Sequence, residues 1–587
     1  MAPVHVARLE ALVSIRRVRI QRRARPAHVL DSLHPVVSRV LAMRGLDSPP
    51  DYSLRQLLPP RLGGMERACE LLIAAISDDA RICVVGDFDA DGATGTALAV
   101  HGLRALGARH VDWLVPDRFR HGYGLSSELV AELEQPLPDV LVTVDQGVSS
   151  HAGIARAREM GIQVIVTDHH LPGESLPPAE AIINPNLSGE DFPSGCLAGV
   201  GVMFYLLMGL RTRMREAGFF DRGREPRLVQ WLDLVALGTV ADLVVLDENN
   251  RRLVHHGLMR IRAGQCLPGV RALLEVAGRN LRHVQAADLG FAAAPRLNAA
   301  GRLDDMRVGV RCLLASTETS ARDLAAELDA LNRERQSLQQ EMQETAEQQA
   351  QELADGLDGE LPGLCVFDSR WHQGVVGLVA GRLMERLQRP VFAFAPAEEG
   401  ADELKGSGRG PDGLHLRDLL VDIDARQPGL IKRFGGHARA AGLSIEKNRF
   451  EDFRRTFDEH VQNIEFPGET VSTDGELSGD ELSLETAEAL ADAGPWGQGW
   501  PEPLFDGRFR VLERRVVGEK HLKLRLSPGG QGPVIDAIAF RAGHLCHRDL
   551  PDPLHVVYSL EVNRWQGRVM PQLNIRYLVD ETGTAND

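Results

Sequence analysis

Three aspartates alternate along one short segment that follows a predicted strand. The segment GDFDADG (86–92) places Asp87, Asp89 and Asp91 at every second position. Burying three carboxylates without partners is very costly, so packing alone does not account for them and the spacing indicates a ligand-binding loop. An EF-hand calcium loop opens with the same Asp-x-Asp-x-Asp-Gly pattern but has glutamate at position twelve. Counted from Asp87, that position is Leu98, and the segment follows a strand rather than a helix.

Further acidic and histidine residues follow other predicted elements. Asp145 ends the run VLVTV, the triplet Asp168-His169-His170 ends VIVT, and Asp242 follows an apolar helix. Each has a simpler explanation alone, because a single aspartate is often a helix cap and a single histidine often lies on the surface. Together, however, these clusters would bring six or more oxygen and nitrogen ligands to one place. Such ligands suit Mg²⁺ or Mn²⁺, and two such ions about 3.5–4 Å apart are the usual apparatus of phosphoester hydrolysis.

Residues 80–245 alternate between short apolar strands and helices. Predicted strands at 81–86, 140–144 and 164–167 each lead into a loop, and a predicted helix at 93–106 follows the first. This alternation is typical of a parallel, doubly wound sheet with helices on both faces. In such sheets the site lies beyond the carboxyl ends of the strands. The pattern therefore places the acidic clusters at the functional edge of one sheet.

The remaining chain indicates further domains. A long helix is predicted from Ser320, with Asp323 completing a capping box, to about Gly356. Its apolar stripe breaks at Arg335, so a spacer between two lobes is favoured over a coiled-coil dimer. Residues 362–460 form a second α/β block, and 465–580 contain short β-like runs typical of a barrel or sandwich. We expect an N-terminal segment at 1–79, a catalytic domain at 80–245, a helical connector at 246–360, a second α/β domain at 361–462 and a β-domain at 463–587.

Composition is that of an ordinary globular protein. The chain has 587 residues, of which 43% are hydrophobic and 25% are charged. It has no uncharged apolar run of about 18 residues, so the sequence predicts no membrane span and no membrane partner. The seven cysteines are scattered without a C-x-x-C pair. That argues against a disulfide framework and a cysteine zinc site, and favours the reducing cytoplasm.

The charge of the chain is unevenly distributed. Its net charge of −16, taken alone, argues against a nucleic-acid partner, because phosphate binding depends on Lys and Arg. An acidic enzyme can nevertheless carry one basic channel. The segment Lys405–Arg439 has seven Lys or Arg against four Asp, a local excess of positive charge. Near the N-terminus, six arginines lie between Arg16 and Arg25; the alternation at 17–22 favours a solvated strand over an arm that touches phosphate.

Eight segments, in the same order along the chain, resemble the DHH phosphoesterase superfamily, which is named for its Asp-His-His triplet. They resemble in particular its single-strand-specific exonucleases and cover nearly the whole sequence. One departure is Val85, where some relatives carry a histidine. The segments are GDFDADGATGTA (86–97), VTVDQGVSS (142–150), TDHH (167–170), ALGTVADLVVL (236–246), PRLNAAGR (295–302), GSGRG (406–410), FGGHARAAG (434–442) and GPWGQGWPEPLF (494–505).

The resemblance implies a fold and a ligand set. The fold is α/β: a doubly wound parallel-sheet DHH domain, a long connecting helix, a second α/β DHH-associated domain (DHHA1) and a C-terminal OB-type β-barrel. One ion would be held by Asp91, Asp145, His169 and Asp242. The other would be held by Asp89 and the bridging Asp145, with Asp87 as a further candidate. His170 would lie against the scissile phosphate as a hydrogen-bond donor or general acid.

The resemblance also implies contacts to the phosphates of a nucleic acid. In GSGRG, Ser407 and Arg409 would grip phosphate, with glycine neighbours that let the strand approach. His437 would contact another phosphate, and so would three arginines for which a surface salt bridge is an equal alternative. These three are Arg118, Arg296 and Arg302.

The activity implied is that of a hydrolase with two Mn²⁺ or Mg²⁺ ions. It would degrade single-stranded DNA from 5′ to 3′ and release 5′-mononucleotides, in recombination and repair. The implied protein is a monomer whose partners include single-strand-binding protein and other repair factors. Smaller relatives act on short RNA, nucleoside bisphosphates, cyclic dinucleotides or pyrophosphate, but the C-terminal block of over 100 residues favours a polymer. A non-catalytic scaffold is disfavoured because the acidic and histidine ligands are all present.

Overall fold

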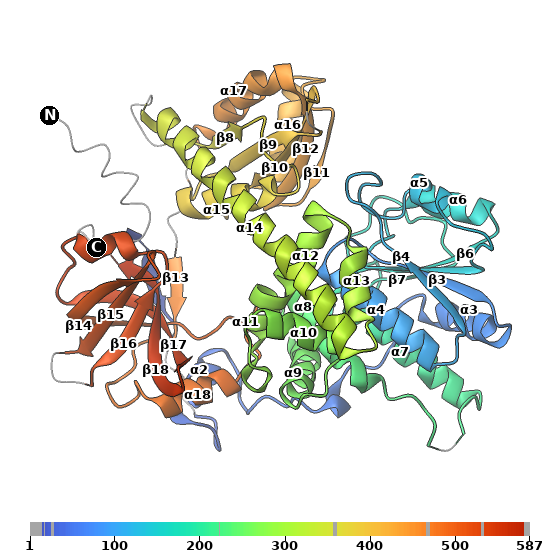
Figure 1. Ribbon diagram of the computed structural model, residues 1–587, viewed down its shortest axis with the longest axis horizontal. Coiled ribbons are helices and arrows are strands. Elements are labelled where there is room, and N and C mark those ends of the chain that lie inside the picture. The colour runs from blue at the N-terminus through green and yellow to red at the C-terminus, as the bar shows by residue number, and fades with distance from the viewer. Residues whose placement is uncertain are drawn as a thin grey trace. The chain divides into compact units, whose positions relative to one another are not determined.

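The chain folds into two compact units (Figure 1). Unit 1 consists of Met1–Pro49, Arg335–Ala493 and Pro503–Asp587, and unit 2 of Pro50–Glu334 and Gly494–Glu502. The computed structural model describes residues 15–16, 18–24, 29–221, 223–355, 361–398, 400–464, 466, 470–529 and 533–579.

Unit 2 contains a five-stranded parallel sheet. The predicted strands at 81–86, 140–144 and 164–167 are its three central strands, which confirms the doubly wound parallel arrangement. Two further strands, which were not predicted, complete its edges. In spatial order the strands are β4 (His110–Leu114), β3 (Arg81–Val85), β5 (Val140–Val144), β6 (Gln163–Thr167) and β7 (Ala181–Ile183).

Helices cover both faces of this sheet and continue beyond it. Figure 1 shows α5 and α6 on one face and α4 and α7 on the other. In chain order the helices of unit 2 are η2 (Leu54–Gln56), α3 (Met65–Ser77), α4 (Ala90–Ala105), α5 (Ser127–Ala131), α6 (His151–Glu159), α7 (Gly199–Glu216), η3 (Leu228–Trp231), α8 (Leu232–Ala241), α9 (Glu248–Arg262), α10 (Pro268–Val276), η4 (Leu281–His283), α11 (Ala286–Asp288), the π-helical η5 (Leu289–Ala293), α12 (Ala294–Leu303) and α13 (Arg307–Leu313).

Alternate residues of the central strands belong to two different cores. Val84 and Val142 pack in the core that contains α4 and α7. Their neighbours Val85 and Leu141 pack in the core that contains α5 and α6. Because successive strand side chains point to opposite faces and both faces are covered, each strand is a continuous apolar run. The sheet is thereby fixed from both sides, and the loops at its carboxyl edge begin from rigid positions.

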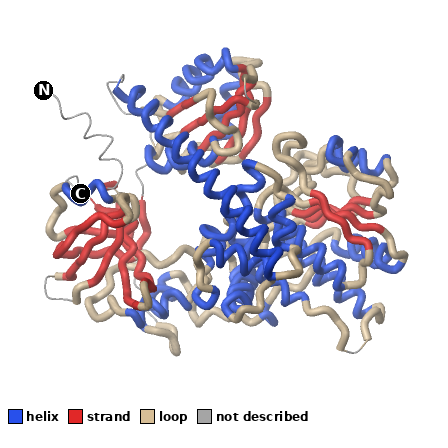
Figure 2. Tube along the Cα trace, in the orientation of Figure 1, coloured by secondary structure: helices blue, strands red, loops and turns tan. Residues whose placement is uncertain are grey.

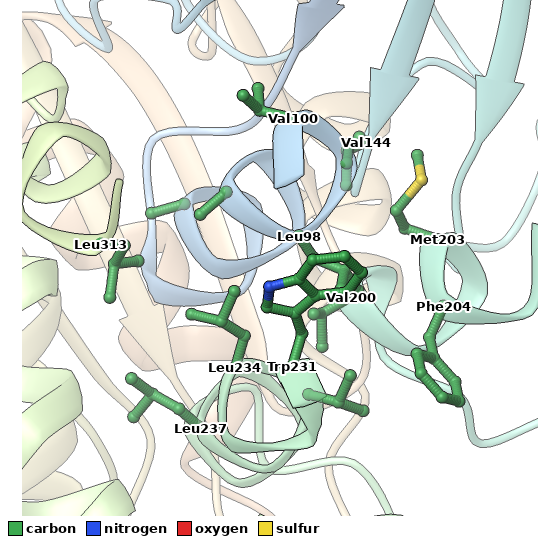
Figure 3. Packing of buried hydrophobic residues seen from close by; sticks show 14 of the residues in the cluster. Leu98, Val100, Val144, Val200, Met203, Phe204, Trp231, Leu234, Leu237 and Leu313 are labelled. Atoms are coloured by element: carbon green, nitrogen blue, oxygen red, sulfur yellow. The ribbon is translucent and has the colours of Figure 1, made fainter. Parts of the chain in front are cut away.

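Trp231 lies among the helices that carry the candidate site residues. Figure 3 shows its indole close to Leu98 of α4, Val200 of α7 and Leu234 of α8. The ring is buried and stacks with the His101 ring at a centroid distance of 6.0 Å. Since α4 and α7 begin at the candidate site and α8 ends there, this packing fixes three backbone segments of the site relative to one another.

The predicted long helix is α14 (Glu318–Asp355), and Figure 2 shows it as one unbroken helix. It begins before the predicted Ser320, because the Thr317 hydroxyl accepts a hydrogen bond from the Ser320 amide at 3.2 Å. The prediction of a capping box beginning at Ser320 was therefore wrong. Leu324 and Leu328, two residues of the predicted stripe, pack in the core of unit 2.

Unit 1 contains a second five-stranded sheet. Phe392 and Phe394 belong to one of its strands, and their side chains project from the same face. Each ring meets that of Phe453 edge-on, with centroid distances of 5.5 Å for Phe392 and 5.4 Å for Phe394. The second α/β domain was predicted here. Its strands, in spatial order, are β11 (Arg433–Gly436), β12 (Ala440–Glu446), β10 (Glu403–Arg409), β9 (Val391–Pro396) and β8 (Leu364–Phe367), and its helices are α15 (Val376–Leu387), α16 (Leu416–Arg426), η6 (Lys447–Arg449) and α17 (Phe450–Val461).

The C-terminal block is a barrel rather than an open sandwich. β17 pairs with both β14 and β18, and a parallel pairing of β16 with β18 completes the closure. The OB-type barrel expected for this block is confirmed. Its elements are β14 (Phe505–Val517), β15 (His521–Pro528), β16 (Ile535–Ala539), η7 (Gly543–His547), β17 (Leu554–Trp565) and β18 (Arg568–Val579), preceded by α18 (Leu484–Asp492) and joined by β1 (Ile15–Arg16).

The N-terminal arginines contribute a strand to unit 1, as the alternation predicted. β2 (Arg19–Arg22) pairs in parallel with β13 (Thr470–Thr473), and α2 (Pro35–Met43) follows in the chain. The Arg22 guanidinium binds the buried Asp506 carboxylate at 2.6 Å, and Arg23 binds Asp474 at 3.2 Å. Arg17 and Arg25 lie outside the described residues. These ion pairs favour a structural role over a phosphate-binding arm.

Two features bear on the cellular setting. Within the described ranges, no helix is both long enough and apolar enough to cross a bilayer. All seven cysteines are free, and all except the partly exposed Cys196 are buried.

We predict that Asp506→Asn destabilises unit 1. Asp506 also accepts a hydrogen bond from the Thr473 hydroxyl at 2.6 Å. Although burial opposes ionisation, hydrogen bonds from His555, Arg22 and Thr473 hold the pKa of Asp506 well below its usual value. Its stabilisation is therefore present above the unfolded-state pKa near 4 and is lost as the pH falls through the lower folded-state value. We expect a loss of about 1–3 kcal/mol at pH 7, measured by denaturant unfolding, that shrinks below about pH 4.

The matched control is Glu476→Gln. Glu476 lies 3.7 Å from the same Arg22 guanidinium, but its side chain is 55% exposed. Its removal is expected to change the free energy of unfolding by under about 0.5 kcal/mol. Equal effects of the two substitutions would contradict the special role of Asp506.

Candidate active site

The carboxyl ends of three neighbouring strands deliver the acidic clusters to one edge of the sheet of unit 2. Asp87 lies just past β3, Asp145 directly follows β5, and Asp168 directly follows β6. The three strands are parallel, so their carboxyl ends meet at the same edge. Asp242 comes to this edge from a helix instead of a strand, as the residue directly after α8. The clusters therefore converge as the sequence predicted.

Backbone amides at the starts of α4 and α7 hold two of the aspartates by hydrogen bonds. The Asp89 carboxylate caps α4 and accepts hydrogen bonds from the amides of Asp91 and Gly92 at 2.9 and 3.0 Å. Asp91 is buried, and its two oxygens accept from the amides of Gly199 and Val200 at 2.6 and 3.0 Å. Those amides begin α7, so the positive end of that helix faces the carboxylate. Both aspartates are thereby oriented before any ligand binds.

Asp145 occupies a crowded and strained position. Its φ of +64° lies in the left-handed region, which costs a non-glycine residue roughly 1–2 kcal/mol and often marks a functional site. The start of α7 approaches it closely. A Cβ atom on Gly199 would lie 2.4 Å from Asp145 Cβ and 2.7 Å from its Cα, which is too short for any contact. Gly199 is therefore required for Asp145 to keep this place.

Asp168 organises the histidine turn. Its Oδ1 accepts from the amides of His169 and His170 at 2.7 and 3.0 Å and lies 2.8 Å from His170 Nδ1. Its Oδ2 accepts from the Val148 amide at 2.9 Å. Burial opposes the charge of His170, but the Asp168 carboxylate raises the pKa of His170 to about 9. Both oxygens of Asp168 therefore take part in positioning the turn. The Tyr123 hydroxyl also lies 3.0 Å from His170 Nδ1.

The remaining groups fit divalent cations. Three sets of side chains each bring ligand atoms within 4.8 Å of one another. Buried atoms of Asp87 (Oδ1), Asp145 (Oδ1) and His169 (Nε2) have no hydrogen-bond partner. His169 Nε2 lies 3.1 Å from Asp145 Oδ1 and 3.5 Å from Asp242 Oδ2, without hydrogen-bond geometry in either case. Such oxygen and nitrogen atoms, which have a lone pair and no hydrogen-bond partner, are suitable ligands for a hard cation. The sets are Asp91 with His169 and Asp242, Asp87 with Asp89 and Asp145, and Asp145 with His169 and His170.

Electrostatics supports the same conclusion. Burial, followed by the charge of Asp89, raises the pKa of Asp91 to about 7, and burial with the charge of Asp91 raises the pKa of Asp242 to about 9. Burial raises the pKa of Asp145 well above its usual value and lowers that of His169 to about 4. Among the described residues, no Lys or Arg forms an ion pair with these carboxylates. Burial also holds His169 in the neutral form that binds metals.

Two of the predicted phosphate-binding arginines in unit 2 contact an aromatic ring and a carboxylate. The Arg118 guanidinium lies 4.1 Å over the Phe88 ring, and burial lowers the pKa of Arg118. Arg296 binds the buried Asp329 carboxylate at 2.7 Å and donates to the Ala292 carbonyl at 2.6 Å. This is the salt-bridge alternative, so a phosphate contact by Arg296 has no support from its surroundings. Arg302 lies on the same helix, α12, and is partly exposed.

The other predicted phosphate-binding residues lie in unit 1. Ser407 and Arg409 are on β10, and a Cβ on Gly377, near the start of α15, would lie 3.3 Å from Ser407 Oγ and 3.1 Å from Arg409 Nη2. The glycines of this motif have a packing role beyond the predicted close approach of a strand. A Cβ on Gly406 or Gly408 would meet a phenylalanine ring at 2.4 or 2.3 Å, on the opposite face from Ser407 and Arg409. Exposed His437 closes the β11–β12 turn, where its amide donates to the Ala440 carbonyl.

Several residues that support the site were not predicted. Asn184 and Asn186 donate to the carbonyls of His170 and His169 at 2.8 and 2.6 Å. The Asn298 side chain accepts from the amide of Ala90, the first residue of α4, at 2.9 Å. Asn298 lies inside the motif PRLNAAGR, which was a usable signal. No sequence motif around Asn184 or Asn186 indicates that these residues bind the histidine turn.

Family models match three parts of the chain. "DHH family, N-terminal domain" matches residues 81–239, "DHHA1 domain" matches 361–463 and "RecJ OB domain" matches 473–577. A "Single-stranded-DNA-specific exonuclease RecJ" from Dickeya dadantii (strain 3937) is 53% identical over 93% of this chain and 96% of its own length. The chain belongs to the RecJ family. The RecJ of Escherichia coli (strain K12) is 52% identical over 92% of this chain and 95% of its own length.

Solved RecJ structures agree with the fold and carry metals. The crystal structure of RecJ from Thermus thermophilus in complex with Mn²⁺ has a TM-score of 0.76 and 31% identity, and covers 96% of this chain and 79% of that one. A second, from the same organism in complex with Mg²⁺, has a TM-score of 0.72, 29% identity and coverages of 96% and 78%. The predicted superfamily is confirmed, and the acidic cluster of this RecJ chain fits the kind of ion that these relatives bind.

We predict that Gly199→Ala weakens metal binding by displacing Asp145. The added methyl has no room beside Asp145 Cα and Cβ, so the ligand must move. We expect a loss of about 10–100-fold in Mn²⁺ affinity, measured by isothermal titration calorimetry without substrate. Gly201→Ala, on the same helix, is the control, because its methyl would meet only the flexible Leu197 side chain at 3.3 Å. Wild-type affinity in a folded Gly199→Ala protein would contradict the prediction.

Proposed function

We propose that the chain is a divalent-metal-dependent exonuclease specific for single-stranded DNA. The observation that carries the proposal is the cluster of buried, unpartnered carboxylate and imidazole atoms at the carboxyl edge of the DHH sheet. The names of the RecJ relatives, single-stranded-DNA-specific exonucleases, support the substrate. The OB domain supports it further, because OB barrels are common platforms for single strands.

The metal ligands divide into two sets. Asp91, His169 and Asp242 would hold one ion, Asp87 and Asp89 would hold the other, and Asp145 would contribute to both. When bound, a pair of Mn²⁺ or Mg²⁺ ions stabilises the charge of the phosphodiester transition state and lowers the pKa of water. The first-turn amides that hold Asp89 and Asp91 leave little reorganisation to be made when the ions bind.

His170 is the residue proposed to contact the scissile phosphate. Asp168 binds His170 Nδ1 and the His170 amide, which fixes both the ring and the backbone of the turn. The His170 side chain is 37% exposed, so a substrate can reach it, whereas Asp168 is buried. A positioned imidazole donates a hydrogen bond to phosphate or a proton to the leaving oxygen. Asp168 acts through His170 and is a positioning residue.

Phosphate contacts away from the metals are assigned to Ser407, Arg409 and His437 of unit 1 and to Arg118 and Arg302 of unit 2. Arg409 has no carboxylate partner among the described residues, and its Nη1 donates only to the Gly408 carbonyl at 2.7 Å. The local positive excess of Lys405–Arg439 supports the binding of a polyanion. The phosphate contact of Arg296 stays a prediction without structural support, because the Arg296 guanidinium forms an ion pair with Asp329.

Other expectations remain proposals. They are the 5′→3′ direction, release of 5′-mononucleotides, action in recombination and repair, a monomeric state, binding to single-strand-binding protein and other repair factors, a cytoplasmic location and the five domain boundaries. The resemblance to RecJ supports the first three. The boundaries stay a prediction alongside the family-model ranges.

We predict that wild-type protein releases a 5′-labelled mononucleotide first from single strands, with either Mn²⁺ or Mg²⁺. Asp145→Ala should reduce the rate by at least about a thousandfold, since it removes a ligand shared by both ions. The control is Asp112→Ala, an exposed aspartate of the same sheet. Early release of a 3′ label would contradict the direction. Faster cleavage of a dinucleotide than of a long strand would favour a small-molecule phosphoesterase, and full activity of Asp145→Ala would contradict the metal centre.

We predict that Arg409→Ala raises KM for single-stranded DNA more than it lowers kcat. Its guanidinium is assigned to hold phosphates rather than the reacting atoms, and loss of such uniform binding appears in KM. The measurement is steady-state hydrolysis of an oligonucleotide at several salt concentrations, with Arg455→Ala, an exposed arginine on α17 outside the Lys405–Arg439 segment, as control. An unchanged KM with a reduced kcat would contradict the assignment.

A further inference from the structure

One motif of the sequence has no role in the function proposed so far. Residues 494–502 (GPWGQGWPE), here called the strap, lie between α18 and β14 in the chain. The residues on both sides of the strap belong to unit 1, yet the strap itself folds with unit 2. Trp500 packs against the hydrophobic core of unit 2, and its ring stacks with that of Trp496 at 6.2 Å.

A tight turn forms the centre of the strap. Gly497 and Trp500 exchange two backbone hydrogen bonds, at 2.8 and 3.1 Å. Between them, Gly499 has a φ of +71°, a conformation that glycine adopts without steric cost. The turn fixes the direction of the Gln498 carbonyl between these two residues.

The Gln498 carbonyl binds the backbone of Leu246, four residues after the predicted metal ligand Asp242. The Gln498 carbonyl accepts from the buried Leu246 amide at 2.8 Å. The Leu246 carbonyl in turn accepts from Arg251 Nη1 at 2.9 Å, and the Arg251 guanidinium lies 4.2 Å over the Trp500 ring. Both backbone groups of Leu246 are therefore held, one by the strap and the other by a side chain that stacks on the strap.

The segment held in this way connects directly to the metal centre. Asp242 directly follows α8, and the next residue, Leu243, has a left-handed φ of +59°, so the chain turns sharply there. Further on, the Val245 carbonyl accepts from Asn250 Nδ2 at 2.9 Å. The same Nδ2 donates to the Cys196 carbonyl at 2.7 Å. Cys196 lies shortly before the α7 amides that hold Asp91, so one side chain ties the Asp242 segment to the support of a second ligand.

We propose that the strap is a positioning element for the Asp242 side of the metal centre. It holds residues 243–246 so that Asp242 faces Asp91 and His169, and it thereby sets the affinity of the ion that these three residues bind. This inference rests on the metal centre of the proposed function. The other set, Asp87 with Asp89, is held by β3 and the first turn of α4, neither of which touches the strap through any hydrogen bond found among the described residues.

A purely structural role predicts a different outcome. If the strap only covered the core, its disturbance would lower stability without a preference between the two ions. If it positions Asp242, a small displacement weakens one ion selectively, because supporting groups of a metal ligand change its affinity by about 10–100-fold. Binding of Mn²⁺ in the absence of DNA separates these cases and does not depend on nuclease activity.

The decisive substitution is Gly499→Ala in the full chain. Its Cβ would lie 2.5 Å from Val245 Cγ1, which pushes on the segment after Asp242, and it also strains the turn. The double variant Gly499→Ala with Val245→Ala removes the clashing atom and keeps the strain. Gly475→Ala in unit 1 is the control for strain alone, because Gly475 has a φ of +87° and its Cβ would meet no heavy atom within 4 Å.

We expect Gly499→Ala to weaken one of two Mn²⁺ sites by about 10–100-fold, with the other within about threefold of wild type. Calorimetric titration and electron paramagnetic resonance of bound Mn²⁺ give both affinities. Hydrogen exchange should be faster at the Leu246 amide. The double variant should recover most of the lost affinity, and Gly475→Ala should match wild type.

Unchanged Mn²⁺ binding by a folded Gly499→Ala protein would overturn the proposal, as would equal weakening of both sites. If circular dichroism shows that Gly499→Ala does not fold, Arg251→Gln is tested instead, with the same selective weakening expected and the same overturning results. Failure of the proposed function would look different: wild-type protein would bind two Mn²⁺ ions normally and yet leave single-stranded DNA intact.

Discussion

Buried carboxylates that form no ion pair with Lys or Arg among the described residues are the constraint on which this structure depends. Asp87, Asp91 and Asp145 are almost inaccessible to solvent, and Asp242 lies beside them. Burial raises the pKa of Asp91, Asp145 and Asp242, and the charges of neighbouring carboxylates raise it further. A fold cannot retain such a cluster cheaply unless a bound cation offsets the cost of desolvation. The cluster therefore favours metal binding strongly, and the rest of unit 2 keeps its members from moving apart.

The scaffold meets this constraint with backbone groups more than with side chains. Helix amides hold Asp89 and Asp91, and the close approach of Gly199 to Asp145 brings the start of α7 against the strand end. Packing around Trp231 joins α4, α7 and α8 in one hydrophobic core. None of the three helices can therefore shift without disturbing the packing of the other two. Backbone groups on packed helices have few alternative positions, which makes the ligand geometry insensitive to side-chain motion.

Acidic residues at the same edge have distinct tasks. Asp168 accepts four hydrogen bonds and so has little capacity left for a metal, whereas Asp145, at the end of the adjacent strand, has a buried oxygen without any partner. The environment, not the residue type, separates the positioning carboxylate from the ligand. The strap differs from both, because its Gln498 carbonyl binds the Leu246 amide and its Trp500 ring stacks on Arg251, and neither group is a proposed metal ligand.

Local sequence alone determined the central strands, their parallel arrangement and the residues with metal-ligand chemistry. Short, mainly apolar runs that lead into loops containing Asp leave few other structures, and alternating aspartates have no packing use. The tertiary structure decided what no local pattern contains. It placed Asn184 and Asn186 on the histidine carbonyls, occupied Arg296 with Asp329, turned the glycines of GSGRG onto phenylalanine rings and brought the strap to Leu246. Most of these contacts join residues far apart in the chain, and they form only when separate elements pack together, so their partners cannot be recognised from spacing.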